Sequence, residues 1–279
     1  MIAPIVARAG ASTHTGLRRA LNEDALFAQA PLFLVADGMG GHQAGDVASG
    51  TVIEGFAALQ GRPALTIDDV SFTLARVRAA VDAIAGVPLS NGGISKAGTT
   101  LSGVTIAAVD GVGYWLAMNI GDSRTYRLSG GVLEQISVDH SVVQELIDSG
   151  ELLATDAPKD RRRNIITRAI GAGSTGEADY WMIPARVGDR ILVCSDGLSS
   201  EVGDDEIRTL LMMHEDPQAA ADRLVDRALE HGGRDNVTAV VVDAIHVSTR
   251  PGIDGTTGID DEDIDSDTRP RAEAMGGMR

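Results

Sequence analysis

The stretch PLFLVADGMGGHQAG (residues 31–45) joins an apolar run to a glycine-rich turn and places one acid between them. A turn accounts for the glycines, because glycine adopts backbone conformations that other residues avoid. It does not account for Asp37, which directly follows a run that is typical of a buried strand. The position of Asp37 at the edge of a core therefore needs an explanation other than the turn.

The same arrangement recurs along the chain. One such acid is most often a turn residue, but several at the ends of strands that share a core indicate a common site. Two carboxylates about 4 Å apart repel by roughly 4 kcal/mol at an effective dielectric near 20, so several stay ionised together only around cations. Ligands that are all oxygen favour Mg²⁺ or Mn²⁺, whereas zinc prefers His or Cys. The further acids are Glu23 and Asp24 before ALFA, Asp122 after YWLAMNIG, Asp196 after RILVCS, and Asp235 before VTAVVV.

Composition sets limits on the class of protein. The chain has 279 residues, 43% of them hydrophobic and 23% charged, which is enough for a substantial core. A net charge of -16 argues against nucleic acid or an anionic membrane as a partner. The single cysteine, Cys194, excludes an intrachain disulfide and favours a reducing compartment. With no signal-peptide pattern and no apolar run long enough to span a membrane, we expect a soluble cytoplasmic protein.

Hydrophobic periodicity predicts helices over residues 44–59, 66–86, 141–149, 204–213 and 217–231. The first of these would present Val47, Val52, Phe56 and Leu59 to a core. Strands are predicted over residues 25–28, 32–36, 99–109, 114–119, 124–128, 132–136, 180–184, 191–195 and 237–246. Consecutive hairpins indicate antiparallel sheets. The pattern predicts an α+β fold in which sheets pack together and helices lie outside.

Two segments differ from the rest. Residues 248–279 are acidic and glycine-rich with almost no apolar anchor, which predicts a disordered tail after residue 247. Between residues 151 and 175 the periodic pattern lapses, and KDRRRN (residues 159–164) is the most basic stretch of an acidic protein. It is either a solvated loop or a mobile flap that meets an anionic substrate.

Eight motifs follow one another along the chain: RALNEDA, VADGMGGHQAG, AGTTL, NIGDSRTYRL, DHS, ITRAIG, CSDGLS and RDNVTAVVV. In these motifs and in their order, the chain resembles the metal-dependent Ser/Thr protein phosphatases of the PPM (protein phosphatase 2C) type, particularly the compact bacterial members. The resemblance covers about residues 8–246. It implies a central antiparallel β-sandwich flanked by helices on both sides, in four layers α-β-β-α. It also implies one phosphatase domain over residues 1–247, with a flap-like insertion at about 151–175.

The resemblance also implies a role for each acid, with two or three Mn²⁺ or Mg²⁺ ions per chain. Asp37 would bridge two metal ions, one of which the Gly38 carbonyl would also bind. Asp196 and Asp235 would hold the other ion, and Asp122 together with Asp196 would hold a third. Glu23 and Asp24 would act near the metals through bound water, and Arg19 would bind the phosphate.

These roles imply hydrolysis of phosphoserine and phosphothreonine in proteins. A metal-bridged water or hydroxide would attack phosphorus in line, without a phospho-enzyme intermediate. The expected partners are phosphorylated proteins, the substrates of Ser/Thr kinases, and the expected state is a monomer. Two alternatives stay open: a catalytically inactive phosphoprotein-binding regulator of the same fold, and a two-metal hydrolase acting on nucleic acid or a small phosphoester.

One position departs from the eukaryotic pattern of the family. There, a histidine directly after the Asp-Gly pair is the proposed general acid, whereas this chain has Met39 and its nearest histidine is His42. His42 as the proton donor to the leaving oxygen is one hypothesis. A metal-bound water as the donor and a purely structural His42 are the alternatives.

Overall fold

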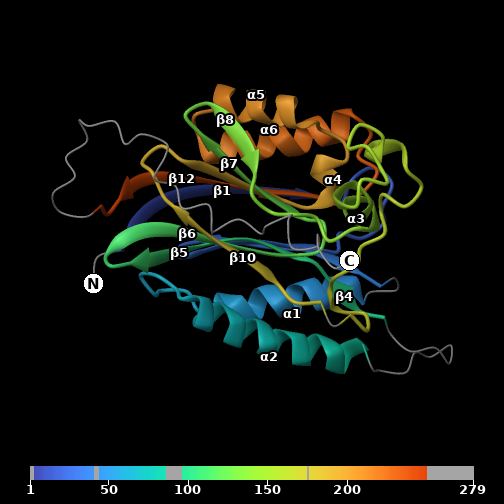
Figure 1. The fold of residues 1–279 in the computed structure, drawn as a ribbon, viewed down its shortest axis with the longest axis horizontal. Helices are drawn as coiled ribbons and strands as arrows, with labels where there is room; N and C mark the ends of the chain where they lie inside the picture. The colour runs from blue at the N-terminus through green and yellow to red at the C-terminus, as the bar shows by residue number, and fades with distance from the viewer. Residues whose placement is uncertain (1–2, 41–43, 86–95, 175, 250–279) are drawn as a thin grey trace, which may run out of the picture.

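A computed structural model describes residues 3–40, 44–85, 96–174 and 176–249. Two antiparallel sheets stack face to face, and a pair of helices covers each outer face (Figure 1). The predicted α+β class and its four layers are therefore confirmed. Within the described part of the chain, no helix combines the length and the apolarity needed to cross a bilayer.

The first sheet contains a long strand that the periodicity did not predict. β1 (Ile5–His14) pairs antiparallel with β12 over its full length, from Ile5 opposite Val247 to His14 opposite Val237. Its sequence IVARAGASTH is mostly small and polar, because helix α6 (Pro217–Glu230) lies close against it: a Cβ on Gly10 would lie 2.2 Å from Gln218 N. The strand order is β1, β12 (Val237–Val247), β11 (Arg190–Cys194), β7 (Arg124–Ser129) and β8 (Val132–Gln135).

The second sheet has seven strands and carries the opening motif on a central strand. Its β3 (Leu32–Met39) pairs with β2 (Asp24–Gln29) and with β5 (Leu101–Val109), and the end of β3 pairs with β4 (Gly98–Thr99). The remaining strands are β6 (Val112–Ile120), β9 (Ile170–Gly171) and β10 (Asp179–Pro184).

Central strands read as unbroken apolar runs because both of their faces are buried. Along β12, Val237, Ala239 and Val241 face the core under the upper helices, while Val240, Val242 and Ala244 face the core between the sheets. β3 divides in the same way. Leu32, Leu34 and Ala36 pack toward the lower helices, and Phe33 and Val35 pack between the sheets. Alternate side chains of one run thus serve two cores.

The lower helix pair is α1 (Gly45–Ala57) and α2 (Ile67–Ala85). At the start of α2, Thr66 and Asp69 cap each other's backbone N–H groups, at 3.1 Å and 3.0 Å. On α1, Val52 and Phe56 are buried as predicted, but the prediction for Val47 was wrong, since 46% of that residue is exposed. The upper pair is α5 (Asp204–Met213) and α6 (Pro217–Glu230).

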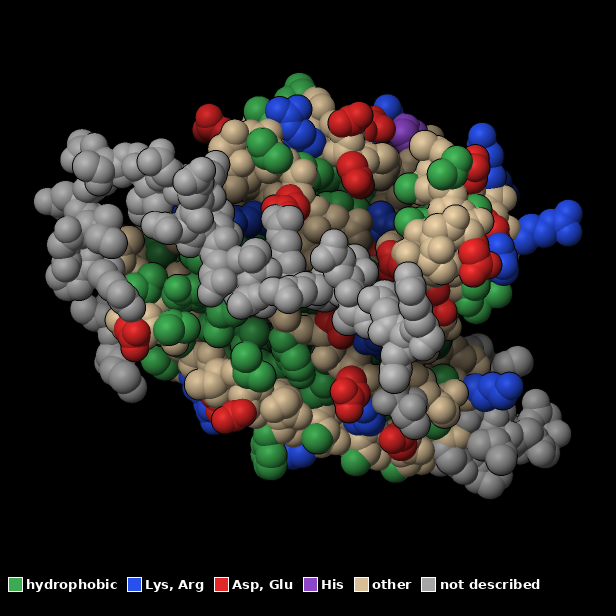
Figure 2. All heavy atoms as spheres, in the orientation of Figure 1, with side chains coloured by type: hydrophobic (Ala, Val, Ile, Leu, Met, Phe, Trp, Pro, Cys, Tyr) green, Lys and Arg blue, Asp and Glu red, His purple; other side chains and the backbone are tan. Residues whose placement is uncertain are grey.

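One end of the sandwich gathers the acid-bearing strand ends. Short helices α3 (Val142–Asp148) and α4 (Asp196–Ser199) lie there, beside an irregular loop over residues 149–169 that contains the 3₁₀ turn Ala157–Lys159 (Figure 1). On the face seen in Figure 2, acidic and basic side chains are interspersed over the upper helices. Hydrophobic side chains gather lower down, in the region of the edge strand β10 and its neighbour β6.

Candidate active site

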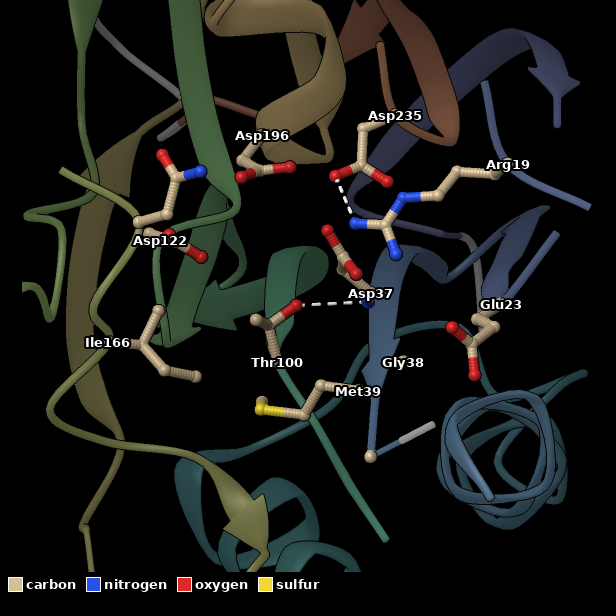
Figure 3. A pocket seen from close by; sticks show the side chains of 12 residues that line it. Arg19, Glu23, Asp37, Gly38, Met39, Thr100, Asp122, Ile166, Asp196 and Asp235 are labelled. Carbon is tan, nitrogen blue, oxygen red and sulfur yellow. Dashed lines mark hydrogen bonds and ion pairs between the residues drawn. The ribbon is translucent and has the colours of Figure 1, made fainter. Parts of the chain in front are cut away.

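A cavity of about 270 Å³ opens at the acid-bearing end of the sandwich (Figure 3). The carboxylates of Asp37, Asp196 and Asp235 point toward one another, with Asp122 on one side and Glu23 on the other. Its walls are Arg19, Glu23, Asp37, Gly38, Met39, Gly40, Thr100, Asp122, Asn164, Ile166, Asp196 and Asp235.

Asp37 is held by its backbone at the end of β3. The sequence predicted that the strand ends at Ala36, before this acid. In the structure the strand continues through Gly38 to Met39, so Asp37 lies within it. Its N–H donates to the Thr100 hydroxyl at 3.0 Å, and its C=O accepts from Thr100 N–H and from the Thr99 hydroxyl, both at 2.9 Å. With both backbone groups bonded, the carboxylate is free to face the cavity.

Gly38 is required by close packing. A Cβ there would lie 2.2 Å from the carbonyl oxygen of Gly45 and 2.5 Å from that of Glu23, which no side chain allows. This contact brings the start of α1 against the end of β3. The glycine and the acid of the opening motif are therefore two parts of one local structure.

The remaining acids come from three other chain segments. Asp122 follows β6, Asp196 opens α4 directly after β11, and Asp235 precedes β12 by two residues. Gly197 lets α4 approach β12, because a Cβ there would lie 1.9 Å from the Asn236 carbonyl oxygen. Segments far apart in the sequence thus bring four aspartates to one cavity.

Arg19 reaches the cavity from the loop between β1 and β2. Its Nη2 lies 2.7 Å from an Asp235 carboxylate oxygen, and its side chain is half exposed. The Asn236 amide organises this loop: its Nδ2 donates to the carbonyls of Thr15 and Leu21, both at 2.9 Å, and its Oδ1 accepts from Glu23 N–H at 2.9 Å. Asn236 thus connects the base of β12 to the segment that carries Arg19 and Glu23.

Glu23 and Asp24, adjacent in sequence, have different environments. Glu23 lines the cavity. Asp24 lies behind it, where its Oδ2 accepts from the Ser195 hydroxyl at 2.8 Å and the Thr238 hydroxyl at 2.6 Å. Its Oδ1 is buried and has no hydrogen-bond partner among the described residues.

The electrostatics of the site oppose ionisation of its carboxyls. Burial, followed by repulsion from Asp196 and Asp139, raises the pKa of Asp122 to about 8. Burial and the charge of Asp235 raise the pKa of Asp196 to about 6, while burial raises the pKa of Asp24 to about 7. The pKa of Asp37 lies well above its usual value, because of burial and then repulsion from neighbouring acids.

These features fit divalent cations bound through oxygen. Among the described residues, no three acid, histidine or cysteine side chains converge tightly enough to form a ready-made ligand set. The acids line a looser ring around the cavity, and one of them, Asp235, is bonded to Arg19. An all-oxygen donor set with raised pKa values and one buried unpartnered oxygen suits Mg²⁺ or Mn²⁺, which would neutralise the repulsion.

The structure brings almost all the predicted site residues together. Arg19, Glu23, Asp37, Gly38, Asp122, Asp196 and Asp235 line one cavity, and Asp24 lies directly behind it. His42 lies outside the described residues. Sequence reasoning assigned no role to Thr100, Asn236, Asn164 or Ile166. Thr100 and Asn236 stand in motifs that carry the resemblance, AGTTL and RDNVTAVVV, which was the available signal.

A four-layer sandwich with an acid-lined cavity at one end defines the class of metal-dependent phosphatases to which the motifs pointed. The profile of the protein phosphatase 2C family matches residues 15–241. The chain belongs to this family.

Named relatives agree with that assignment. The serine/threonine protein phosphatase PstP of Mycobacterium tuberculosis is 40% identical over 268 residues, which cover 93% of this chain and 50% of PstP. The serine/threonine phosphatase stp of Listeria monocytogenes is 35% identical, covering 76% of this chain and 84% of stp. A crystal structure of the PstP catalytic domain with two manganese ions superposes with a TM-score of 0.75 at 39% identity, over 87% of this chain and all of that one. The chain thus spans about half the length of the mycobacterial relative.

Proposed function

We propose that residues 1–247 form one phosphatase domain that hydrolyses phosphoserine and phosphothreonine in proteins, using two or three Mn²⁺ or Mg²⁺ ions. The observation that carries this proposal is the convergence of Asp37, Asp122, Asp196 and Asp235 on one cavity with Arg19 at its edge. Relatives that are named Ser/Thr phosphatases, one of them crystallised with two manganese ions, support it. In this proposal, the phosphoprotein substrates come from Ser/Thr kinases.

Asp37, the Gly38 carbonyl, Asp196 and Asp235 would hold two cations, and Asp122 with Asp196 would hold a third. Bound divalent cations activate water at neutral pH and stabilise charge on the attacking and leaving oxygens of an in-line displacement. The protein's own part is positioning. Backbone bonds from Thr99 and Thr100 fix Asp37, and the Asn236 amide fixes the segment that carries Glu23.

Arg19 would bind the substrate phosphate. Its guanidinium can offer two N–H donors to two phosphate oxygens, a geometry that lysine cannot reproduce. In the structure this guanidinium is bonded to Asp235. A cation held by Asp235 would compete with this ion pair and would leave the Arg19 guanidinium available to the phosphate.

The loop over residues 151–175 would act as a flap that selects phosphopeptides. A second cavity of about 230 Å³ adjoins the first and shares Asp122, Asn164 and Asp196 with it. Arg163 lines this second cavity, and its side chain forms no ion pair with any described residue. In this proposal, a peptide whose phosphate lies beside Arg19 extends through the second cavity and contacts Arg163.

The proton donor to the leaving serine or threonine oxygen is proposed to be His42. Peptide alkoxides are poor leaving groups and need a proton, whereas activated aryl phosphates do not. His42→Ala should therefore lower kcat on phosphopeptides and leave aryl phosphate hydrolysis nearly unchanged. An unchanged kcat on phosphopeptides would reject this role.

The decisive assay for the proposed activity is phosphate release from phosphoserine and phosphothreonine peptides with Mn²⁺, Mg²⁺ or EDTA. We expect turnover with either metal, none in EDTA, and none in Asp37→Ala under any condition. Turnover that survives EDTA would overturn the mechanism. Metal-dependent peptide binding without turnover would favour the inactive regulator.

A further inference from the structure

His140 is a buried histidine that lines neither cavity, and no role has been assigned to it. It lies in the DHS motif between β8 and α3. Its ring Nδ1 accepts a hydrogen bond from Gly121 N–H at 3.2 Å, and its Nε2 lies 3.0 Å from Asp179 Oδ2. The two ring nitrogens thus connect the turn before Asp122 to the first residue of β10.

The hydrogen bonds determine the tautomer. A backbone N–H can only donate, so the Nδ1 that faces Gly121 must present its lone pair. The ring proton is then on Nε2, where Asp179 Oδ2 accepts it at 3.0 Å. Arg168 Nη1 also lies 3.2 Å from Nε2, but as a second donor it bonds to Asp179 Oδ1 and not to the protonated ring nitrogen. Asp179 Oδ1 also accepts from Arg168 at 3.0 Å, which holds that carboxylate in place. The Nε2 side of the ring is therefore held by a carboxylate that is itself held by an arginine.

The Gly121 peptide needs such support. Gly121 has a φ of +104°, and a Cβ there would lie 2.5 Å from Thr100 Cγ2, so only glycine fits. Lacking a side chain, it has little steric restriction of its own. Its carbonyl accepts from His140 N–H at 2.8 Å and from Asn119 Nδ2 at 3.0 Å. With the bond to Nδ1, two of these three hydrogen bonds come from His140.

We propose that His140 is a positioning residue that fixes the direction of the Asp122 carboxylate through the Gly121 peptide. Asp122 directly follows this peptide and lines the catalytic cavity. His140 also contacts the C-terminal part of the flap, because its backbone carbonyl accepts from Thr167 N–H at 2.8 Å. The inference rests on the proposed function in one respect, that Asp122 is a cation ligand.

Two isosteric variants separate the two ring nitrogens. In His140→Asn, the side-chain oxygen can occupy the place of Nδ1, which keeps the acceptor for Gly121 and loses the bond to Asp179. In His140→Gln, the amide nitrogen can occupy the place of Nε2, which keeps the bond to Asp179 and loses the acceptor for Gly121. If His140 served folding alone, any difference in Mn²⁺ affinity between the two variants would follow the difference in their melting temperatures.

The experiment is calorimetric titration of the wild type and both variants with Mn²⁺, with Asp122→Ala as the reference for loss of the third ion and thermal melting as the folding control. One Mn²⁺ binding step should be lost in Asp122→Ala. We expect His140→Gln to lower the affinity of that step about tenfold, and His140→Asn to keep its affinity within about twofold of the wild type. The steps that survive in Asp122→Ala should be unchanged in both.

Equal weakening in both histidine variants, no weakening in either, or weakening of every step alike would overturn the inference. If both variants fail to fold, Asp179→Ala takes their place, because it removes the acceptor that fixes the ring from its more exposed side. It should weaken the same step by a smaller factor, and an unchanged step would reject the role. A wild type that binds no Mn²⁺ would instead reject the proposed function, and this inference with it.

Discussion

The hydroxyl of Thr100, which lies between β4 and β5, is 2.7 Å from the hydroxyl of Ser123, the residue after Asp122. The same Thr100 oxygen accepts from Asp37 N–H at 3.0 Å. One buried side chain therefore fixes the relative placement of two acids that are 85 positions apart in the sequence. The site is held by hydrogen bonds between strand ends as well as by its charged groups.

Thr100→Val should weaken both the site and the fold. It leaves the Asp37 N–H and the Ser123 hydroxyl without their buried partner, which costs about 1–3 kcal/mol. For a chain of this size that corresponds to a fall in Tm of about 2–4 °C for each kcal/mol. We also expect kcat to fall about tenfold, since a shifted Asp37 misplaces what it binds. Thr100→Ser, which keeps the hydroxyl, is the control. Equal kcat in the two variants would refute the role of the hydroxyl.

Asn236→Ala should impair phosphate binding without touching a proposed metal ligand. It removes the amide that organises the loop carrying Arg19. We expect KM for a small aryl phosphate to rise severalfold at saturating Mn²⁺, with a smaller change in kcat. Asn22→Ala is the matched control. Asn22 lies in the same loop, but among the described residues its Nδ2 bonds only to the Thr13 hydroxyl and its Oδ1 only to Asp24 N–H. A rise in KM of the same size in both variants would assign the effect to loop disorder in general.

Stability without metal should fall as pH rises. The pKa values of Asp196, Asp24 and Asp122, about 6, 7 and 8, lie above the value near 3.9 of an unfolded aspartate. Between about pH 4 and 8 the folded protein keeps protons that the unfolded chain has lost, so this contribution to stability disappears through that window. Tm in EDTA should therefore fall by several degrees from pH 5.5 to pH 8.5, and saturating Mn²⁺ should remove most of that fall. A Tm in EDTA that rises over this range would contradict the account of the acids.

Removal of the basic side chains of the flap should change substrate selection and not chemistry. Replacing Arg161, Arg162 and Arg163 with Ala should lower kcat/KM on phosphopeptides while sparing a small aryl phosphate. Arg163→Ala should account for most of the loss, because Arg162 is already bonded to Asp160 and Arg163 lines the second cavity. Arg162→Ala is thus the single-site control. Equal losses on both substrates would show that the loop serves the chemistry.

The sequence was most informative where a charge interrupts an apolar run. Asp37, Asp122 and Asp196 stood out because each follows an apolar run that is buried on both faces and leaves no place for a carboxylate. The five predicted helices match α1, α2, α3, α5 and α6 almost to their ends, since helices such as α2 and α6 carry clear apolar stripes. Local pattern was sufficient for these features. The four-residue helix α4 was not predicted, because it is too short to show a periodic pattern.

The rest depended on tertiary contacts. β1 was not predicted because its small residues reflect the approach of α6, which no local pattern reveals. Thr100, Asn236 and His140 are polar hydrogen-bonding residues, and such residues occur throughout any chain. Their importance lies in which backbone groups the fold brings to them, such as Gly121 N–H at the ring of His140. That pairing depends on how the loop after β8 packs against the turn after β6, and not on neighbours in the sequence.

The central claim is that Asp37 organises a binding site for divalent cations, and calorimetric titration with Mn²⁺ tests it most directly. Wild type and Asp37→Asn would be compared, with Asp205→Asn on the exposed start of α5 as the control for loss of one negative charge. The account predicts at least two bound ions in the wild type and in Asp205→Asn. It predicts the loss of at least one ion, with affinity for the rest reduced tenfold or more, in Asp37→Asn. The same stoichiometry and affinity in all three proteins would contradict it.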